Sequence, residues 1–152
     1  MTRAEKLYVL LVDDNEATCT LVTALLQREF VVETAGDGGE AIERLKTRNY
    51  AAIILDLRMP VLDGFGVLEY LSANKPEVLR HVLILTAALS EREISRVRQY
   101  DVCGIVAKPF EVETLLAAVK QCVGDDGPLL SRFFLSNGMI LLLAEVLRQR
   151  LV

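Results

Sequence analysis

The chain has 152 residues, of which 17 are basic and 21 are acidic, so its formal charge is 17 − 21 = −4. This length predicts one domain of ordinary size with room for a short appendage. Hydrophobic residues make up 52% and charged residues 25%, which excludes an intrinsically disordered chain. The acidic balance argues against direct nucleic-acid binding. No apolar run approaches the roughly 18 residues of a membrane-spanning helix.

Five short apolar runs alternate with five amphipathic stretches along most of the chain. Runs rich in Val, Ile and Leu are typical of strands buried on both faces of a parallel sheet. We expect such strands at residues 7–12, 31–35, 51–55, 82–85 and 104–107. Apolar side chains at helical spacing predict helices at 16–28, 39–48, 64–73, 91–100 and 111–123. The alternation predicts an α/β fold with right-handed crossovers.

Glycine, aspartate and proline cluster at residues 124–128, directly after the last predicted helix. This composition predicts a linker or a helix stop. We therefore expect a domain at residues 6–123, a linker at 124–128 and an extension at 129–152. The extension is too short for a second domain and reads as one amphipathic helix.

The cysteines give no sign of a metal site or of a redox motif. Cys19, Cys103 and Cys122 are far apart and form neither a CxxC pair nor a zinc-binding spacing. We therefore expect buried or idle thiols in a reducing compartment, the cytoplasm. The charged N-terminus shows no signal-peptide pattern. The single histidine, His81, is expected to be a loop residue.

Polar side chains follow the predicted strands at the edge where such folds bind ligands. In an open α/β sheet, ligands lie outside the carboxyl ends of the strands. The side chains expected there are Asp13, Asp14, Asp56, Thr86 and Lys108. Three neighbouring carboxylates repel one another unless a cation lies between them, and their hard oxygen atoms suit Mg²⁺. With a lysine and a hydroxyl nearby, the set predicts phosphoryl transfer to an aspartate nucleophile.

Five segments resemble the receiver domain of response regulators in two-component signalling. They are Val12-Asp13-Asp14, Asp37-Gly38-Gly39-Glu40-Ala41, the stretch from Asp56 to Gly64, Leu85-Thr86-Ala87, and Ala107-Lys108-Pro109-Phe110. The resemblance covers about residues 6–123. It implies a flavodoxin-like, doubly wound parallel sheet of strand order 2-1-3-4-5, here with an extra C-terminal helix.

The resemblance also implies a role for each residue of the set. Asp56 would accept a phosphoryl group from a sensor histidine kinase or a phosphotransfer protein. Asp14, Asp56 and the backbone carbonyl of Arg58 would bind Mg²⁺, with Asp13 acting through water. Lys108 would pair with Asp56 and then with the phosphoryl oxygens, and Thr86 would move its hydroxyl onto the phosphoryl group. The Lys108–Pro109 peptide would be cis. Such a domain catalyses only its own phosphorylation and dephosphorylation and is not otherwise an enzyme.

One position departs from the usual receiver sequence, and two others should affect the lifetime of the phosphoryl group. Receivers usually carry an aromatic residue three positions before the lysine, where this chain has Ile105. We expect either that Ile105 packs inward or that the protein signals through another surface. Arg58 and Ala88 each lie two positions beyond a site residue. The cation of Arg58 can shield the acyl phosphate from water, and Ala88 has no polar group to orient a hydrolytic water. We therefore expect slow self-dephosphorylation.

Three other functions remain open at this level. A haloacid-dehalogenase-like phosphohydrolase would need a second aspartate where this chain has Arg58. A flavodoxin-like flavin binder would need a hydroxyl-rich loop where Asp13 and Asp14 would repel a phosphate. A degenerate receiver acting as a phosphorylation-independent protein-binding scaffold would not use the acidic set. The fourth predicted helix and the C-terminal helix are candidate homodimer surfaces.

Overall fold

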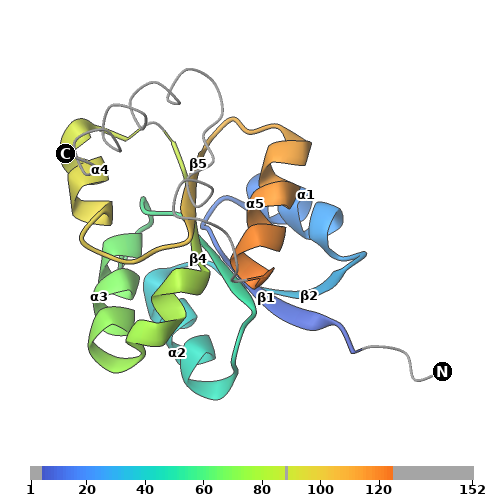
Figure 1. Ribbon diagram of the computed structural model, residues 1–152, viewed down its shortest axis with the longest axis horizontal. Helices are drawn as coiled ribbons and strands as arrows, with labels where there is room; N and C mark the ends of the chain where they lie inside the picture. Colours follow the sequence, from blue (N-terminus) through green and yellow to red (C-terminus); the bar gives the residue numbers. More distant parts are fainter. Residues whose placement is uncertain (1–4, 88, 125–152) are drawn as a thin grey trace.

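The computed structural model describes residues 5–87 and 89–124. Its five strands all run parallel in the order β2-β1-β3-β4-β5, which confirms the expected fold (Figure 1). The strands are β1 (Leu7–Val12), β2 (Phe30–Ala35), β3 (Ala52–Leu55), β4 (Val82–Thr86) and β5 (Gly104–Ala107). The helices are α1 (Glu16–Leu26), α2 (Gly38–Thr47), α3 (Gly64–Asn74), η1 (Pro76–His81), α4 (Glu91–Val97) and α5 (Val112–Gly124).

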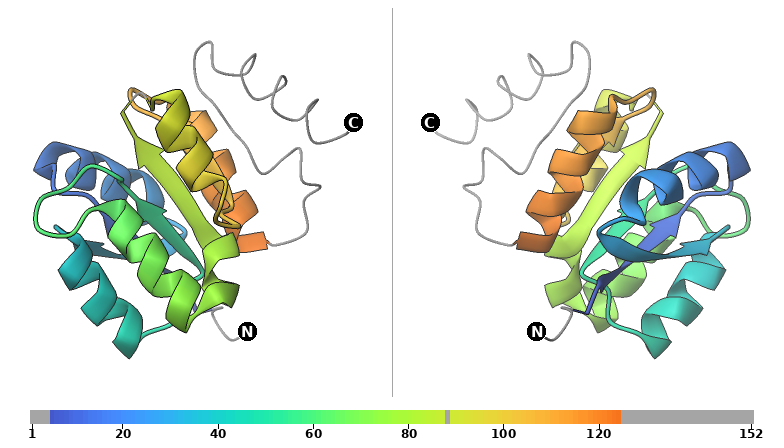
Figure 2. Two further views of the ribbon diagram at one scale, coloured as in Figure 1. Left: turned by 90° about the vertical axis from the view of Figure 1, so that its left-hand side faces the viewer. Right: turned by 90° about the vertical axis from the view of Figure 1, so that its right-hand side faces the viewer.

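Helices cover both faces of the sheet, which explains why most strands are continuously apolar. Helices α2, α3 and α4 pack on one face and helices α1 and α5 on the other (Figures 1 and 2). Alternate residues of β1 pack on opposite faces of the sheet. Leu10 and Val12 pack against α2, α3 and α4, whereas Val9 and Leu11 pack on the face covered by α1 and α5. Strand β2 lies at the sheet edge and is the least buried, in agreement with its mixed sequence.

Side-chain caps begin the helices that flank the carboxyl edge of the sheet. The side chain of Asn15 accepts a hydrogen bond from the Thr18 amide, 2.9 Å away, at the start of α1. At the start of α3, the side chain of Asp63 accepts from the Gly66 amide at 3.0 Å. These caps satisfy amide groups that the first helical turn leaves unpaired. They therefore fix how the chain leaves β1 and enters α3.

Most element boundaries differ from the sequence prediction by one or two residues, and two differences are larger. The 3₁₀ helix η1 was not predicted, because a proline-led stretch of six residues has no helical repeat of apolar positions. Helix α4 ends at Val97 instead of residue 100. There the amides of Gln99 and Tyr100 bond carbonyls three residues back, which tightens the chain out of the α-helix.

Two of the three cysteines are buried as expected, but they are not thiols. Cys103 and Cys122, 19 residues apart, form a disulfide. Helix α5 runs back along the sheet, so its last turn returns to the residue that precedes β5, which sequence spacing alone does not reveal. His81, in η1 and not in a loop, has its Nδ1 atom 2.8 Å from the Cys122 carbonyl oxygen. Cys19 remains a free thiol.

No helix in the described part of the chain combines the length and apolar character needed to span a bilayer. The predicted domain boundaries stay a prediction. The expected linker beyond Gly124 and the C-terminal helix at 129–152 lie outside the described residues.

Candidate functional site

The carboxyl ends of four parallel strands meet at one edge of the sheet and bring the five predicted side chains together. Asp13 and Asp14 follow β1, Asp56 follows β3, Thr86 ends β4 and Lys108 follows β5. Backbone hydrogen bonds continue the sheet into these positions: the Asp56 amide donates to Val12 at 2.9 Å, and the Lys108 amide to Thr86 at 2.8 Å. The site is therefore built on the ends of rigid, buried strands.

Asp56 lies at the centre of this group and is only 6% exposed. Its Oδ1 atom accepts two hydrogen bonds, one from the Thr86 hydroxyl and one from the Arg58 amide, each 3.0 Å long. Its Oδ2 atom lies 3.3 Å from Nζ of Lys108. The carboxylate is thus held in one orientation by three donors from three different segments.

Lys108 links two of the three aspartates. Its Nζ atom lies 2.6 Å from Oδ2 of Asp13 as well as 3.3 Å from Oδ2 of Asp56. Burial alone lowers the pKa of Lys108. The hydrogen bond to Asp13 and the charge of Asp56 outweigh that effect, so its pKa is raised above the ordinary value. Lys108 therefore stays protonated and supplies a fixed positive charge.

Among the described residues, three aspartates lie close enough together that they could hold a metal ion. Carboxylate oxygens of Asp13, Asp14 and Asp56 lie within 4.8 Å of one another. Three carboxylates and one lysine carry a formal charge of −2, which a divalent cation would neutralise, and hard oxygen ligands suit Mg²⁺. Both oxygens of Asp13 are already engaged, Oδ1 by the Asn15 amide at 2.9 Å and Oδ2 by Lys108. The donor set therefore fits a divalent cation held mainly by the other two aspartates.

The loop from Asp56 to α3 passes close to the site and is tightly constrained. At Gly64, any Cβ atom would collide with the backbone of Asp56 and Leu57. Glycine thus permits α3 to start directly beneath the Asp56 loop. Within the same loop, Val61 has a φ of 69° and a side chain that is 93% exposed. This left-handed conformation is unfavourable for a β-branched residue.

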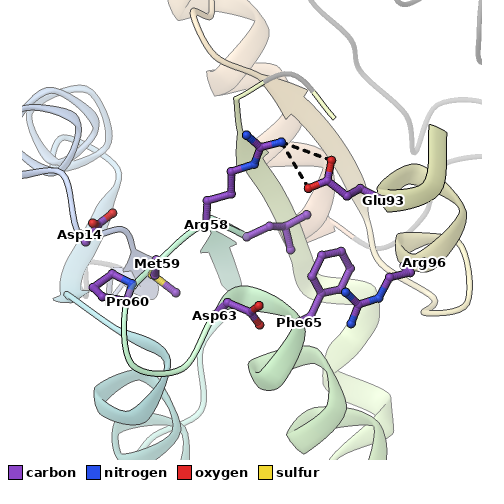
Figure 3. Close-up of a pocket in the computed structure, with 9 residues that line it drawn as sticks. Asp14, Arg58, Met59, Pro60, Asp63, Phe65, Glu93 and Arg96 are labelled. Atoms are coloured by element: carbon purple, nitrogen blue, oxygen red, sulfur yellow. Dashed lines mark hydrogen bonds and ion pairs between the residues drawn. The ribbon is translucent and has the colours of Figure 1, made fainter. Parts of the chain in front are cut away.

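A cleft of about 400 Å³ opens beside the site between the Asp56 loop and α4. Figure 3 shows Arg58 reaching across it to Glu93, with Asp14 beyond the loop and Arg96 next to Phe65. The Nη2 atom of Arg58 lies 3.3 Å from Oε2 of Glu93. No sequence motif indicates this pairing; only the spacing of Ser90 and Glu93 is typical of a capping box.

The remaining sequence predictions can be placed as well. Ile105 is 4% exposed and packs inward in the core layer under α2, α3 and α4. This is the first of the two alternatives expected from the sequence. The Lys108–Pro109 peptide is cis. Ala88 lies outside the described residues.

Comparison with known proteins identifies the family of this chain. The profile of the response regulator receiver domain matches residues 9–120. A probable chemotaxis protein CheY from Rhizobium etli is 32% identical over 126 residues, covering 82% of this chain and 98% of its own. This chain belongs to the response regulator receiver domain family. It is a phospho-accepting signalling domain, and membership of this family implies a kinase partner.

Solved structures agree with this assignment. The chemotaxis protein CheY4 of Vibrio cholerae superimposes with a TM-score of 0.70 at 30% identity, covering 78% of this chain and 99% of that one. A CheY-like receiver domain from Methanospirillum hungatei gives a TM-score of 0.74 at 20% identity, covering 80% of this chain and 96% of that one. The second likeness concerns the fold alone. In this receiver, the acidic pocket and Lys108 are consistent with a phospho-accepting aspartate.

Proposed function

We propose that Asp56 accepts a phosphoryl group from a phosphohistidine of a sensor histidine kinase or phosphotransfer protein, in a Mg²⁺-dependent reaction. The observation that carries this proposal is the placement of the Asp56 carboxylate. Thr86 and the Arg58 amide hold Oδ1, while Oδ2 faces the protonated Lys108. A carboxylate fixed in this way is oriented for attack without further ordering.

The other two aspartates suit supporting roles. Asp13 has both oxygens engaged, and its side chain is 1% exposed. Asp14 is exposed at the mouth of the group, within reach of a cation shared with Asp56. We assign Mg²⁺ to Asp14, Asp56 and the backbone carbonyl of Arg58, with Asp13 acting through water. Bound there, the ion supplies positive charge to the phosphoryl oxygens.

The transfer balances as a simple substitution at phosphorus. A carboxylate oxygen of Asp56 forms a bond to phosphorus while the bond from phosphorus to the donor imidazole nitrogen breaks. The imidazole leaves neutral after taking a proton from solvent, and Asp56 becomes an aspartyl phosphate. Lys108 then pairs with the phosphoryl oxygens. The Thr86 hydroxyl, which donates to Asp56 Oδ1 before phosphorylation, then donates to a phosphoryl oxygen. Fixed donors aimed at developing charge are the main source of catalysis in such sites.

Further parts of the proposal concern partners and location. We propose that homodimers, where they form, use the α4 face or the C-terminal helix at 129–152, and that this chain contacts no nucleic acid. We place the protein in the cytoplasm. Disulfides are uncommon there, so the Cys103–Cys122 bond counts against this location. A free-thiol count on protein trapped inside cells decides the matter, because three thiols support the cytoplasm and one contradicts it.

Intact mass after incubation with acetyl phosphate and Mg²⁺ tests the function. We expect native protein to gain one phosphoryl group, and Asp56→Asn to gain none. Asp37→Asn is a matched control, because Asp37 caps α2 away from the site and asparagine caps equally well. This control should gain the group as native protein does. Failure of native protein to gain it would favour the phosphorylation-independent scaffold.

A further inference from the structure

Arg58 connects the phosphoacceptor to α4. Its backbone amide donates to Asp56 Oδ1 at 3.0 Å. Its side chain crosses the cleft, where Nη2 lies 3.3 Å from both carboxylate oxygens of Glu93 (Figure 3). One residue thus touches the carboxylate that changes on phosphorylation and the first turn of a helix on the far side of the cleft.

Glu93 is held independently by its own helix. Its Oε2 atom accepts from the Ser90 amide at 2.8 Å and from the Ser90 hydroxyl at 2.9 Å, while the Glu93 amide donates back to Ser90 Oγ at 3.2 Å. The hydrogen bonds from Ser90, followed by the charge of Arg58, lower the pKa of Glu93. This reciprocal capping box survives without Arg58. Arg58 is therefore a replaceable partner of Glu93.

The usual aromatic relay is absent from this receiver. Ile105 occupies the position and has no polar group, and its side chain is buried in the core. The Thr86 hydroxyl already contacts Asp56. A signal from Asp56 to α4 through Arg58 and Glu93 needs no movement of Ile105.

We propose that the Arg58–Glu93 ion pair is the switch contact of this receiver. When Asp56 is phosphorylated, the Arg58 guanidinium leaves Glu93 for the phosphoryl oxygens, and the first turn of α4 is released from the Asp56 loop. The inference rests on the proposed phosphorylation of Asp56 and adds the route by which that event reaches a surface helix.

Charge and exposure favour this exchange. A phosphoryl group carries a charge near −2 and three strong acceptor oxygens, and arginine binds such groups through paired hydrogen bonds. The Arg58 side chain is 56% exposed and that of Glu93 is 26% exposed, and ion pairs of this kind are held weakly. Lys108 is engaged with Asp13 at 2.6 Å, so a second cation gains by turning to the new charge.

The release should be confined to one end of α4. Arg96, near the other end, lies over the Phe65 ring at 3.7 Å from its centroid, and this contact does not involve Asp56. We therefore expect phosphorylation to loosen the turn from Ser90 to Glu93 and to leave the contact at Arg96 in place.

Hydrogen–deuterium exchange of α4 peptides, with and without acetyl phosphate and Mg²⁺, tests the inference. The informative variant is Glu93→Gln, because glutamine retains the capping box and loses the charge that holds Arg58. Arg92→Gln, an exposed change in the same turn, is the matched control. In native protein and the control, phosphorylation should speed exchange in the first turn about two- to fivefold, the size expected of one partly exposed ion pair. In Glu93→Gln, exchange should be fast already and should not change.

The lifetime of the acyl phosphate gives a second, independent reading. Glu93→Gln removes the charge that competes with the phosphoryl group for Arg58, so the half-life should rise about two- to fivefold. The same substitution in an Arg58→Ala background should leave the half-life unchanged, which a merely structural role of Glu93 would not require.

The outcomes separate this inference from the proposed function. Phosphorylated native protein with unchanged exchange at α4 would overturn the switch contact and leave the phosphoacceptor role intact. An equal response in Glu93→Gln would do the same. Native protein that takes up no phosphoryl group would overturn both.

Discussion

Two ion pairs flank Asp56, and they differ in burial and in geometry. On one side, Lys108 lies 2.6 Å from Asp13, with side chains 22% and 1% exposed. On the other, Arg58 lies 3.3 Å from Glu93, with side chains 56% and 26% exposed. Removing one partner of a buried pair is strongly destabilising, whereas an exposed pair exchanges partners at little cost. The same aspartate therefore has a fixed support on one side and a movable contact on the other.

Removing Lys108 should give the largest effect on stability. Lys108→Met leaves Asp13 and Asp56 buried beside each other without their cation. We expect a loss of about 3 kcal/mol in the free energy of unfolding in metal-free buffer, at the low end for a broken buried pair because Lys108 is partly exposed. Urea denaturation measures it. Lys46→Met is the matched control, since its exposed pair with Glu43 should contribute much less to stability. Equal losses in the two variants would remove the contrast between buried and exposed pairs.

Asp14→Asn tests whether Asp14 is a Mg²⁺ ligand. Removing one of three close carboxylates relieves repulsion, so metal-free protein should gain about 0.5–1 kcal/mol. Native protein should gain about 1.4 kcal/mol from Mg²⁺ at ten times its dissociation constant, and the variant far less. Thermal denaturation with and without Mg²⁺ follows both effects. Equal stabilisation by Mg²⁺ in both proteins would exclude Asp14 as a ligand.

Val61→Gly tests the backbone of the loop that carries Arg58. Val61 has a φ of 69° and a side chain that is 93% exposed, so glycine relieves strain and forfeits little packing. We expect a gain of about 1 kcal/mol. Val61→Ala keeps the unfavourable conformation and should give no such gain. Urea denaturation of the two variants measures the difference, and a loss of stability in Val61→Gly would show that the exposed side chain makes a contact.

The smallest expected effect is on the loss of stability at acid pH, through the carboxylate of Glu93. The pKa of Glu93 is lowered from about 4.5, first by the hydrogen bond from the Ser90 amide. A lowered folded-state pKa adds stability above pH 4.5 that is lost as the pH falls through the folded value. Glu93→Gln should therefore lose slightly less stability than native protein between pH 6 and pH 3.5 in urea titrations. A larger acid loss in the variant would reverse the sign of this contribution.

The sheet and the polar residues at its carboxyl edge could be predicted from the sequence, because both follow from local patterns. Apolar runs give buried strands, and parallel strands bring Asp13, Asp56 and Lys108 to one edge whatever the details of packing. The Arg58–Glu93 and Cys103–Cys122 pairs could not be predicted in this way. Each joins segments whose separation depends on how a helix lies against the sheet, which residue spacing does not encode. The left-handed Val61 gave no signal either, because valine ordinarily avoids that conformation.

Of three neighbouring carboxylates, Asp56 is the one proposed to receive the phosphoryl group. Borohydride reduction of phosphorylated protein, followed by peptide mass analysis, tests it directly, because an aspartyl phosphate is reduced to homoserine where the group was attached. We expect homoserine at position 56 and unchanged Asp13 and Asp14. Homoserine at either of those two positions, with Asp56 unchanged, would contradict it.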